Sequence, residues 1–229
     1  MRTLFVTGTD TGVGKTRVAC ALLAAFAARG LRVAGMKPVA AGAMETPEGL
    51  RNEDAVALIS ASTGRPPYPT VNPYVFAAPV APHIAAADAG VAISIETITA
   101  GHAELASGND IVIVEGAGGL LVPLGESNTF ADLALRLEAP VILVVGLRLG
   151  CLNHALLTVE ALANRGLRLA GWIGSALDPD FARSDENRAY LRRHISAPCW
   201  GTLPHRPRAD ARTDAADLDP ASIHHSCAG

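Results

Sequence analysis

An α/β fold, built on a single doubly wound, mainly parallel sheet with helices on both faces, is predicted by three features of this sequence. Residues 111–114 and 141–145 are continuously apolar, as interior strands covered on both faces are. Strand-like segments alternate with helical ones, which favours parallel strands joined by crossover helices. The 229 residues, of which 49% are hydrophobic and 18% charged, suit one well-buried domain.

The N-terminal half is predicted to begin with a strand over residues 3–7. An alanine-rich helix over 15–29, ended by Gly30, and a strand over 31–36 follow. Residues 39–52 should form a loop that leads into a short helix over 53–60. The proline-rich segment 64–82 is expected to be a long ordered crossover or lid rather than a strand, because proline breaks regular elements.

The C-terminal half continues the alternation. The pattern predicts a helix over 95–106, a strand over 110–115, a helix over 130–137, a strand over 141–146, a helix over 153–165 and a strand over 169–174. A helix over 184–195 and a short strand over 199–203 complete the core. We expect one domain over residues 1–206 and a polar, aperiodic, flexible tail over 207–229.

Composition excludes several classes of function. A net charge of −3 gives no basic field for nucleic acid, and 4% aromatic residues are too few for base-stacking platforms. No apolar run reaches the roughly 18 residues that span a bilayer, and no leader-like segment precedes the first strand. The four cysteines show no metal-binding spacing. We expect a cytoplasmic protein that binds neither nucleic acid nor membrane.

The strongest functional signal is the run LFVTGTDTGVGKT at residues 4–16. An apolar strand enters a glycine-rich turn, and a helix follows directly. Backbone N–H groups and the helix dipole at such a turn bind phosphate, Lys15 can reach the β- and γ-phosphates, and Thr16 can ligate Mg²⁺. Five residues separate Gly8 from Gly14, where the common pattern has four, so an ordinary glycine-rich turn is the alternative. The context favours a P-loop NTPase-like fold.

Further candidate residues follow other predicted strands, whose carboxyl ends share one rim of the sheet. Lys37 would place a second positive charge over a phosphoryl group, against the alternative of a solvated lysine. Glu115 fits a Mg²⁺ ligand better than a turn cap. Asp54 opens a helix, so capping and metal binding are equally supported. The helix start at Asn153 could likewise bind a carboxylate or simply be capped.

Several sequence blocks resemble one known family. In order they are VTGTDTGVGKT (6–16), GMKPV (35–39), TPEGLRN (46–52) with Asp54, VNPY (71–74), PH (82–83), VEGAGG (114–119) and LGCLNH (149–154). These blocks, and the extended spacing of the glycine-rich loop, resemble the dethiobiotin synthetases to about residue 205. The resemblance implies a cytoplasmic homodimer that makes dethiobiotin from 7,8-diaminononanoate, CO₂ and ATP through a carbamate that ATP phosphorylates.

The resemblance also implies residue roles. Lys15 and Lys37 would flank the carbamate and the γ-phosphate, and Thr16, Asp54 and Glu115 would bind Mg²⁺. Nucleotide contacts would come from Gly12, Val13, Gly14, Lys15, Thr16, Arg17, Asp54, Glu115, Gly116, Ala117, Gly118, Ser175, Ala176, Pro204, His205 and Arg206. Among these, residues 175–176 and 204–206 would contact the base and ribose. The diamine would meet Thr11, Ala41 and the loop 38–42, and its carboxylate would meet Cys151, Leu152 and Asn153 of the partner subunit.

Three positions depart from the family pattern. Ala41 stands where a substrate-contacting serine is common, and Gly12 where some members carry glutamate. Ser175 stands where a base-reading asparagine is frequent, and its hydroxyl cannot present the paired donor and acceptor of an amide to adenine.

Two other classes of protein are compatible with a phosphate-binding loop. Regulatory ATPases of the ParA and MinD type usually carry a second lysine within the loop, which here holds only Lys15. Amidotransferase-type synthetases such as cobyrinate amidase need a glutaminase domain, for which this chain has no room.

Overall fold

The computed structural model describes residues 2–206, 208 and 210–219. In chain order the elements are β1 (Arg2–Gly8), α1 (Lys15–Ala27), β2 (Val33–Met36), β3 (Val39–Ala41), β4 (Met44–Thr46), β5 (Gly49–Arg51), α2 (Glu53–Ala61), α3 (Tyr68–Val71), β6 (Tyr74–Phe76), α4 (Pro82–Asp88), α5 (Ile95–Gly108), β7 (Ile111–Gly119), α6 (Phe130–Arg136), β8 (Val141–Leu147), α7 (Cys151–Asn164), β9 (Leu169–Ala176), α8 (Ser184–His194), β10 (Cys199–Leu203) and α9 (Ala211–Ala215).

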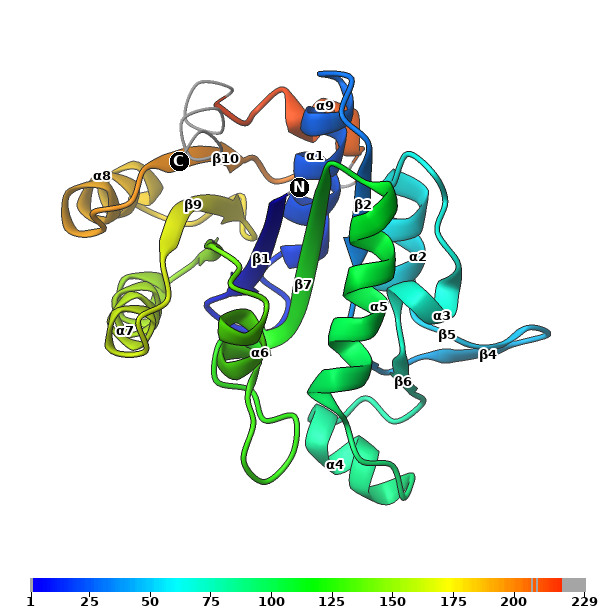
Figure 1. Ribbon diagram of the computed structural model, residues 1–229. Coiled ribbons are helices and arrows are strands. Elements are labelled where there is room, and N and C mark those ends of the chain that lie inside the picture. Colours follow the sequence, from blue (N-terminus) through cyan, green and yellow to red (C-terminus); the bar gives the residue numbers. More distant parts are fainter. Residues whose placement is uncertain (1, 207, 209, 220–229) are drawn as a thin grey trace.

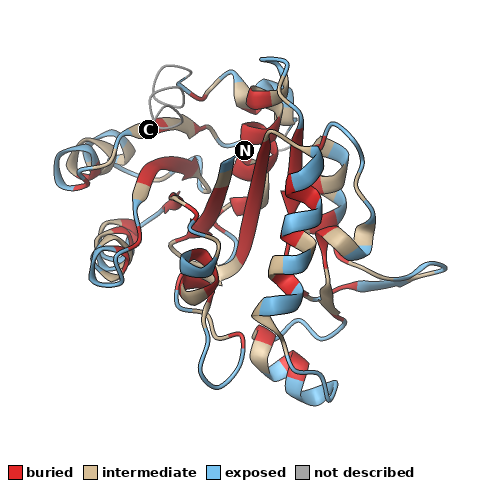
Figure 2. Cartoon of the chain, in the orientation of Figure 1, coloured by how far each residue is buried: buried red, intermediate tan, exposed pale blue. Residues whose placement is uncertain are grey.

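The main sheet has six strands in the order β10-β9-β8-β1-β7-β2, and every neighbouring pair is parallel. Helices cover both faces (Figure 1). Successive residues of β7 serve opposite faces: Val112 and Val114 pack into one apolar cluster and Ile111 and Ile113 into another. The central strands are accordingly buried along most of their length (Figure 2). The predicted doubly wound parallel architecture is confirmed.

The differences from the expected elements concern short pieces of structure. The expected loop 39–52 contains β3 and the hairpin β4–β5, and the proline-rich segment 64–82 contains α3, β6 and the first residue of α4. The expectation that this segment holds no strand is therefore wrong, because β6 pairs in parallel with β3. Proline is tolerated there since it lies before β6 and at the first position of α4.

The C-terminal segment also differs from the expected irregular tail. Residues 211–215 form helix α9, which packs against α1 (Figure 1). Leu218 is buried in the same cluster as α1, and Asp214 is fully buried. Ion pairs hold this helix, so its short sequence needs no strong apolar periodicity of its own.

The buried His102 of α5 gives the fold a dependence on pH. Its ring lies 2.9 Å from the Thr3 hydroxyl, and burial lowers its pKa below the ordinary value. Because the lower pKa means that the unfolded state binds more protons than the folded state, the neutral His102 ring contributes to stability. This contribution is complete above about pH 6.5 and is lost as the pH falls through the pKa of His102 in the folded protein. Urea unfolding should show that His102→Gln loses less stability than the wild type between pH 7.5 and 5.5. An equal loss in both proteins would contradict this.

Candidate active site

The loop between β1 and α1 turns sharply because two glycines adopt left-handed conformations. Gly12 has φ +73° and Gly14, the N-cap of α1, has φ +89°, a region that strongly favours glycine. Lys15 opens α1, and its ammonium donates a hydrogen bond back to the Asp10 carbonyl at 2.9 Å. Free N–H groups at the start of a helix, next to an ammonium, give this loop the chemistry of a phosphate-binding site.

Replacing Gly14 by alanine should destabilise the protein more than replacing Gly12. A Cβ on Gly14 would lie 2.7 Å from the Ser175 hydroxyl oxygen, whereas a Cβ on Gly12 meets nothing within 4 Å. The positive φ alone costs about 1–2 kcal/mol at either position, and at Gly14 the buried Ser175 hydroxyl must also move aside. Urea unfolding of the two variants isolates the clash. Equal losses in free energy of unfolding would contradict the close packing of this loop on β9.

Four polar side chains from distant parts of the chain meet beside this loop. The Lys37 ammonium, just after β2, donates hydrogen bonds to Asp54 Oδ2 at 2.8 Å and to Glu115 Oε1 at 2.6 Å. The Thr16 hydroxyl donates to the same Glu115 oxygen at 2.8 Å. Glu115 lies within β7 and is completely buried, while Asp54 lies in the first turn of α2. The structure thus brings together the residues that the sequence placed on one rim.

The two lysines are held in different electrostatic environments. Burial lowers the pKa of Lys37, but the Glu115 and Asp54 carboxylates outweigh burial and hold the pKa above its ordinary value. For Lys15 burial dominates and the neighbouring Lys37 adds to it, which lowers the pKa to about 8. Burial raises the pKa of Asp54, yet Lys37 brings it below its ordinary value. The site therefore favours an anion, whose charge would stabilise the Lys15 ammonium.

The oxygen atoms of this group fit Mg²⁺ bound together with phosphates. Glu115 Oε2 is buried without a hydrogen-bond partner, which leaves one oxygen of this carboxylate free to accept. The described residues contain no cluster of three histidine, cysteine or acidic side chains able to hold a metal by themselves. Mg²⁺ usually keeps several waters and takes one or two carboxylates plus substrate phosphates. Thr16, Asp54 and Glu115 offer such a set.

A cavity of about 770 Å³ opens at this group. Most of the predicted phosphate, metal and substrate residues line it, namely Thr11, Gly12, Gly14, Lys15, Thr16, Arg17, Lys37, Ala41, Asp54, Glu115, Ala117 and Gly118. Val13 is instead buried in the core, and Gly116 contributes its carbonyl, 3.4 Å from the Lys37 ammonium. Gly12 has open space beside it and Ala41 carries only a methyl group, so neither supplies a polar side chain to the cavity.

The predicted nucleoside contacts, residues 175–176 and 204–206, do not line this cavity. Ser175 is buried at the end of β9 against Gly14, and Ala176 follows it. The Pro204 carbonyl accepts a hydrogen bond from Arg17 at 2.9 Å, and Arg206 pairs with acidic groups near α9. His205 is exposed.

The start of α7 does not contribute to the cavity. Cys151 is buried, Leu152 half-buried and Asn153 exposed, and none of them lines this cavity within the described part of the chain. The preceding Leu149 is 94% exposed. Their position therefore does not support a role in binding substrate in the cavity of the same subunit.

Several residues that complete the site were not predicted. The buried Asn72 donates a hydrogen bond to the Lys37 carbonyl at 2.7 Å, and Tyr68 donates to Asn72 while accepting from the Asn52 N–H. These contacts fix the end of β2 against α2. Residues 79–82 form one wall of the cavity. The block VNPY at 71–74 was the available signal for Asn72, but its buried partners are not apparent from the sequence.

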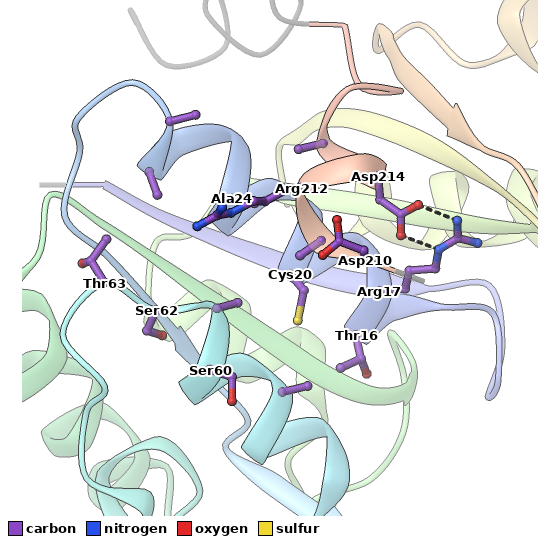
Figure 3. A pocket seen from close by; sticks show the side chains of 16 residues that line it. Thr16, Arg17, Cys20, Ala24, Ser60, Ser62, Thr63, Asp210, Arg212 and Asp214 are labelled. Carbon is purple, nitrogen blue, oxygen red and sulfur yellow. Dashed lines mark hydrogen bonds and ion pairs between the residues drawn. The ribbon is translucent and has the colours of Figure 1, made fainter. Parts of the chain in front are cut away.

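A second groove, of about 920 Å³, runs along α1 between α2 and α9 (Figure 3). Small side chains line much of it, and burial, together with the charges of Glu115 and Asp54, raises the pKa of the Cys20 thiol in its wall to about 12. It shares Thr16 and Arg17 with the first cavity but contains none of the lysines. The two lysines and Glu115 therefore make the first cavity, rather than this groove, the candidate phosphate site.

None of the helices in the described part of the chain has the length and apolar character needed to span a membrane.

Solved proteins with a similar fold include two that cover nearly the whole chain. The MinD cell division protein of Aquifex aeolicus is 14% identical, with a TM-score of 0.61 and coverage of 98% of this chain and 96% of that one. The cobyrinic acid a,c-diamide synthase of Mycobacterium smegmatis is 16% identical, with a TM-score of 0.54 and coverage of 100% and 96%. At these identities the likeness concerns the fold alone.

Sequence comparison is more specific. A family model described as an AAA domain matches residues 2–213. The ATP-dependent dethiobiotin synthetase BioD of Xanthomonas oryzae pv. oryzae (strain PXO99A) is 51% identical over 214 residues, which cover 93% of this chain and 96% of the relative. Because about half of its residues are identical to those of this relative along nearly its whole length, this chain belongs to the dethiobiotin synthetase family.

Proposed function

We propose that this protein is an ATP-dependent dethiobiotin synthetase, a ligase that converts 7,8-diaminononanoate, CO₂ and ATP into dethiobiotin, ADP and phosphate. The observation that carries the proposal is that Lys15 and Lys37 line one cavity together with Glu115 and Thr16. These are the only two lysines in the chain.

The substrate supplies its own nucleophile. One amine adds to CO₂ and loses a proton, which gives a carbamate. A carbamate oxygen then attacks the γ-phosphorus of ATP and ADP leaves. The second amine attacks the carbonyl carbon of the mixed anhydride, phosphate leaves, and the cyclic urea of dethiobiotin forms. No covalent protein intermediate is needed, so the enzyme acts by placing two anions together and neutralising their charge.

The lysines supply that neutralisation. Lys15, held at the start of α1, would contact the β- and γ-phosphates, and Lys37 would contact the carbamate and the transferring phosphoryl group. Thr16, Asp54 and Glu115 would hold Mg²⁺, which when bound supplies further positive charge to the phosphates. Glu115 and Asp54 also position the Lys37 ammonium through its two ion pairs.

The remaining predicted contacts complete the proposal. Residues 12–17, 115–118, 175–176 and 204–206 would surround the nucleotide, and Thr11 with Ala41 would line the diamine site. In a cytoplasmic homodimer, the start of α7 would reach the partner's site and bind the substrate carboxylate. The exposed Leu149 beside that helix start supports such an interface.

Oxygen-18 labelling tests the chemistry directly. With [¹⁸O]bicarbonate, diamine and Mg-ATP, one labelled oxygen should pass from CO₂ into the released phosphate, because a carbamate oxygen attacks phosphorus. Mass spectrometry of phosphate and of dethiobiotin reports both products. Phosphate that stays unlabelled while dethiobiotin forms would exclude phosphorylation of the carbamate.

A further inference from the structure

Asp214 of α9 connects three segments around the start of α1. Its carboxylate accepts two hydrogen bonds from Arg17, one from Nε and one from Nη2, both at 2.6 Å. The two side chains point toward one another from α9 and α1 (Figure 3). Arg206 donates a further hydrogen bond to Asp214 at 2.7 Å. One carboxylate thus joins the first turn of α1, the segment after β10 and α9.

This network is buried as well as charged. The Asp214 side chain is 1% exposed and those of Arg17 and Arg206 are 17% and 28% exposed. Burial raises the pKa of Asp214, but the two arginines outweigh burial and keep it below its ordinary value. The carboxylate is therefore charged and satisfied, and the guanidinium fork of Arg17 is fixed in a bidentate geometry.

The network also reaches the backbone of the segment 204–206. Arg17 Nη1 donates to the Pro204 carbonyl at 2.9 Å, and Arg206 pairs with Asp217 in addition to Asp214. Arg17 directly follows Thr16 in the phosphate-binding turn. One buried acid from outside the sheet thus helps to hold this segment beside the phosphate-binding turn, through its bonds with Arg17 and Arg206.

We propose that Asp214 is a positioning residue for the nucleotide: by holding Arg17 and Arg206, it fixes the segment 204–206 against the first turn of α1 and so sets the affinity for the nucleoside part of ATP. The inference rests on the proposed function for the identity of the nucleotide. It predicts that Asp214 affects nucleotide binding but neither diamine binding nor the chemical step.

Steady-state kinetics of Asp214→Asn separates these effects. The KM for ATP should rise about tenfold, as should the Kd for ADP measured by calorimetry, while the KM for the diamine and kcat at saturating ATP stay within twofold of the wild type. Asp214→Glu keeps the charge and should restore most of the ATP affinity. The ADP Kd does not depend on synthetase turnover, so a failure of the proposed function leaves this test intact.

Asp132→Asn is the matched control. Asp132 is also a hydrogen-bonded acid, in the capping box of α6, and its helix packs into the apolar cluster on the other side of the sheet from α1. Its loss should lower stability without changing the KM for ATP. If Asp214→Asn likewise lowers only stability, or changes kcat and both KM values equally, the proposal is overturned.

Hydrogen exchange on the wild-type protein gives a second readout should Asp214→Asn fail to fold. ADP binding should slow amide exchange in residues 203–206 and in α9, because the bound nucleotide and the contacts of Asp214 with Arg17 and Arg206 stabilise each other. Protection confined to the phosphate-binding turn would overturn the proposal.

Discussion

Lys37→Met should lower the rate of dethiobiotin formation by about 10²–10³-fold, because the variant lacks a charge placed where negative charge develops during phosphoryl transfer. The same change leaves the fully buried Glu115 without its ion-pair partner, which costs about 3–5 kcal/mol of stability. Mass-spectrometric product assays and urea unfolding measure the two effects on one sample.

Lys37→Arg separates charge from geometry. Arginine keeps the positive charge, so much of the lost stability should return, but its planar fork cannot place a compact charge at the position of the ammonium. Activity should therefore remain low. A methionine variant that retains more than a tenth of the wild-type rate would exclude Lys37 from the reaction.

Glu115→Gln should have the second-largest effect, a fall in kcat of about 10²-fold together with a higher Mg²⁺ concentration for half-maximal rate. The amide removes the charge that pairs with Lys37 and the carboxylate that would bind the metal. Asp54→Asn provides a comparison in which a smaller effect is expected. Its carboxylate also accepts from Lys37 but is 41% exposed, so water can compensate for much of its loss. The Mg²⁺ dependence should shift less in Asp54→Asn than in Glu115→Gln, and the reverse order would contradict the arrangement of the site.

Sequence patterns predicted those elements whose formation depends on residues close to one another in the sequence. The strands of the main sheet are long apolar runs, and the phosphate-binding turn needs glycines and a lysine at fixed spacing. Lys37 and Glu115 could be placed together because parallel strands end on one rim, and the ion pair between them follows from that topology.

The elements that were not predicted have no recognisable local sequence pattern. Strands β3, β4, β5 and β6 are three residues long, too short for an alternating pattern to be recognised. Helix α9 depends on the contact between Arg17 and Asp214, which lie 197 positions apart. A buried acid in a polar segment looks like any solvated acid until its distant partner is known, so tertiary contacts decided what local sequence could not.

Phosphate release from Mg-ATP and bicarbonate, measured with and without 7,8-diaminononanoate, tests the synthetase reaction most directly. Release should depend on the diamine and equal the dethiobiotin formed, mole for mole. Release at the same rate without the diamine, and with no dethiobiotin by mass, would contradict a synthetase and indicate a regulatory ATPase with the same fold.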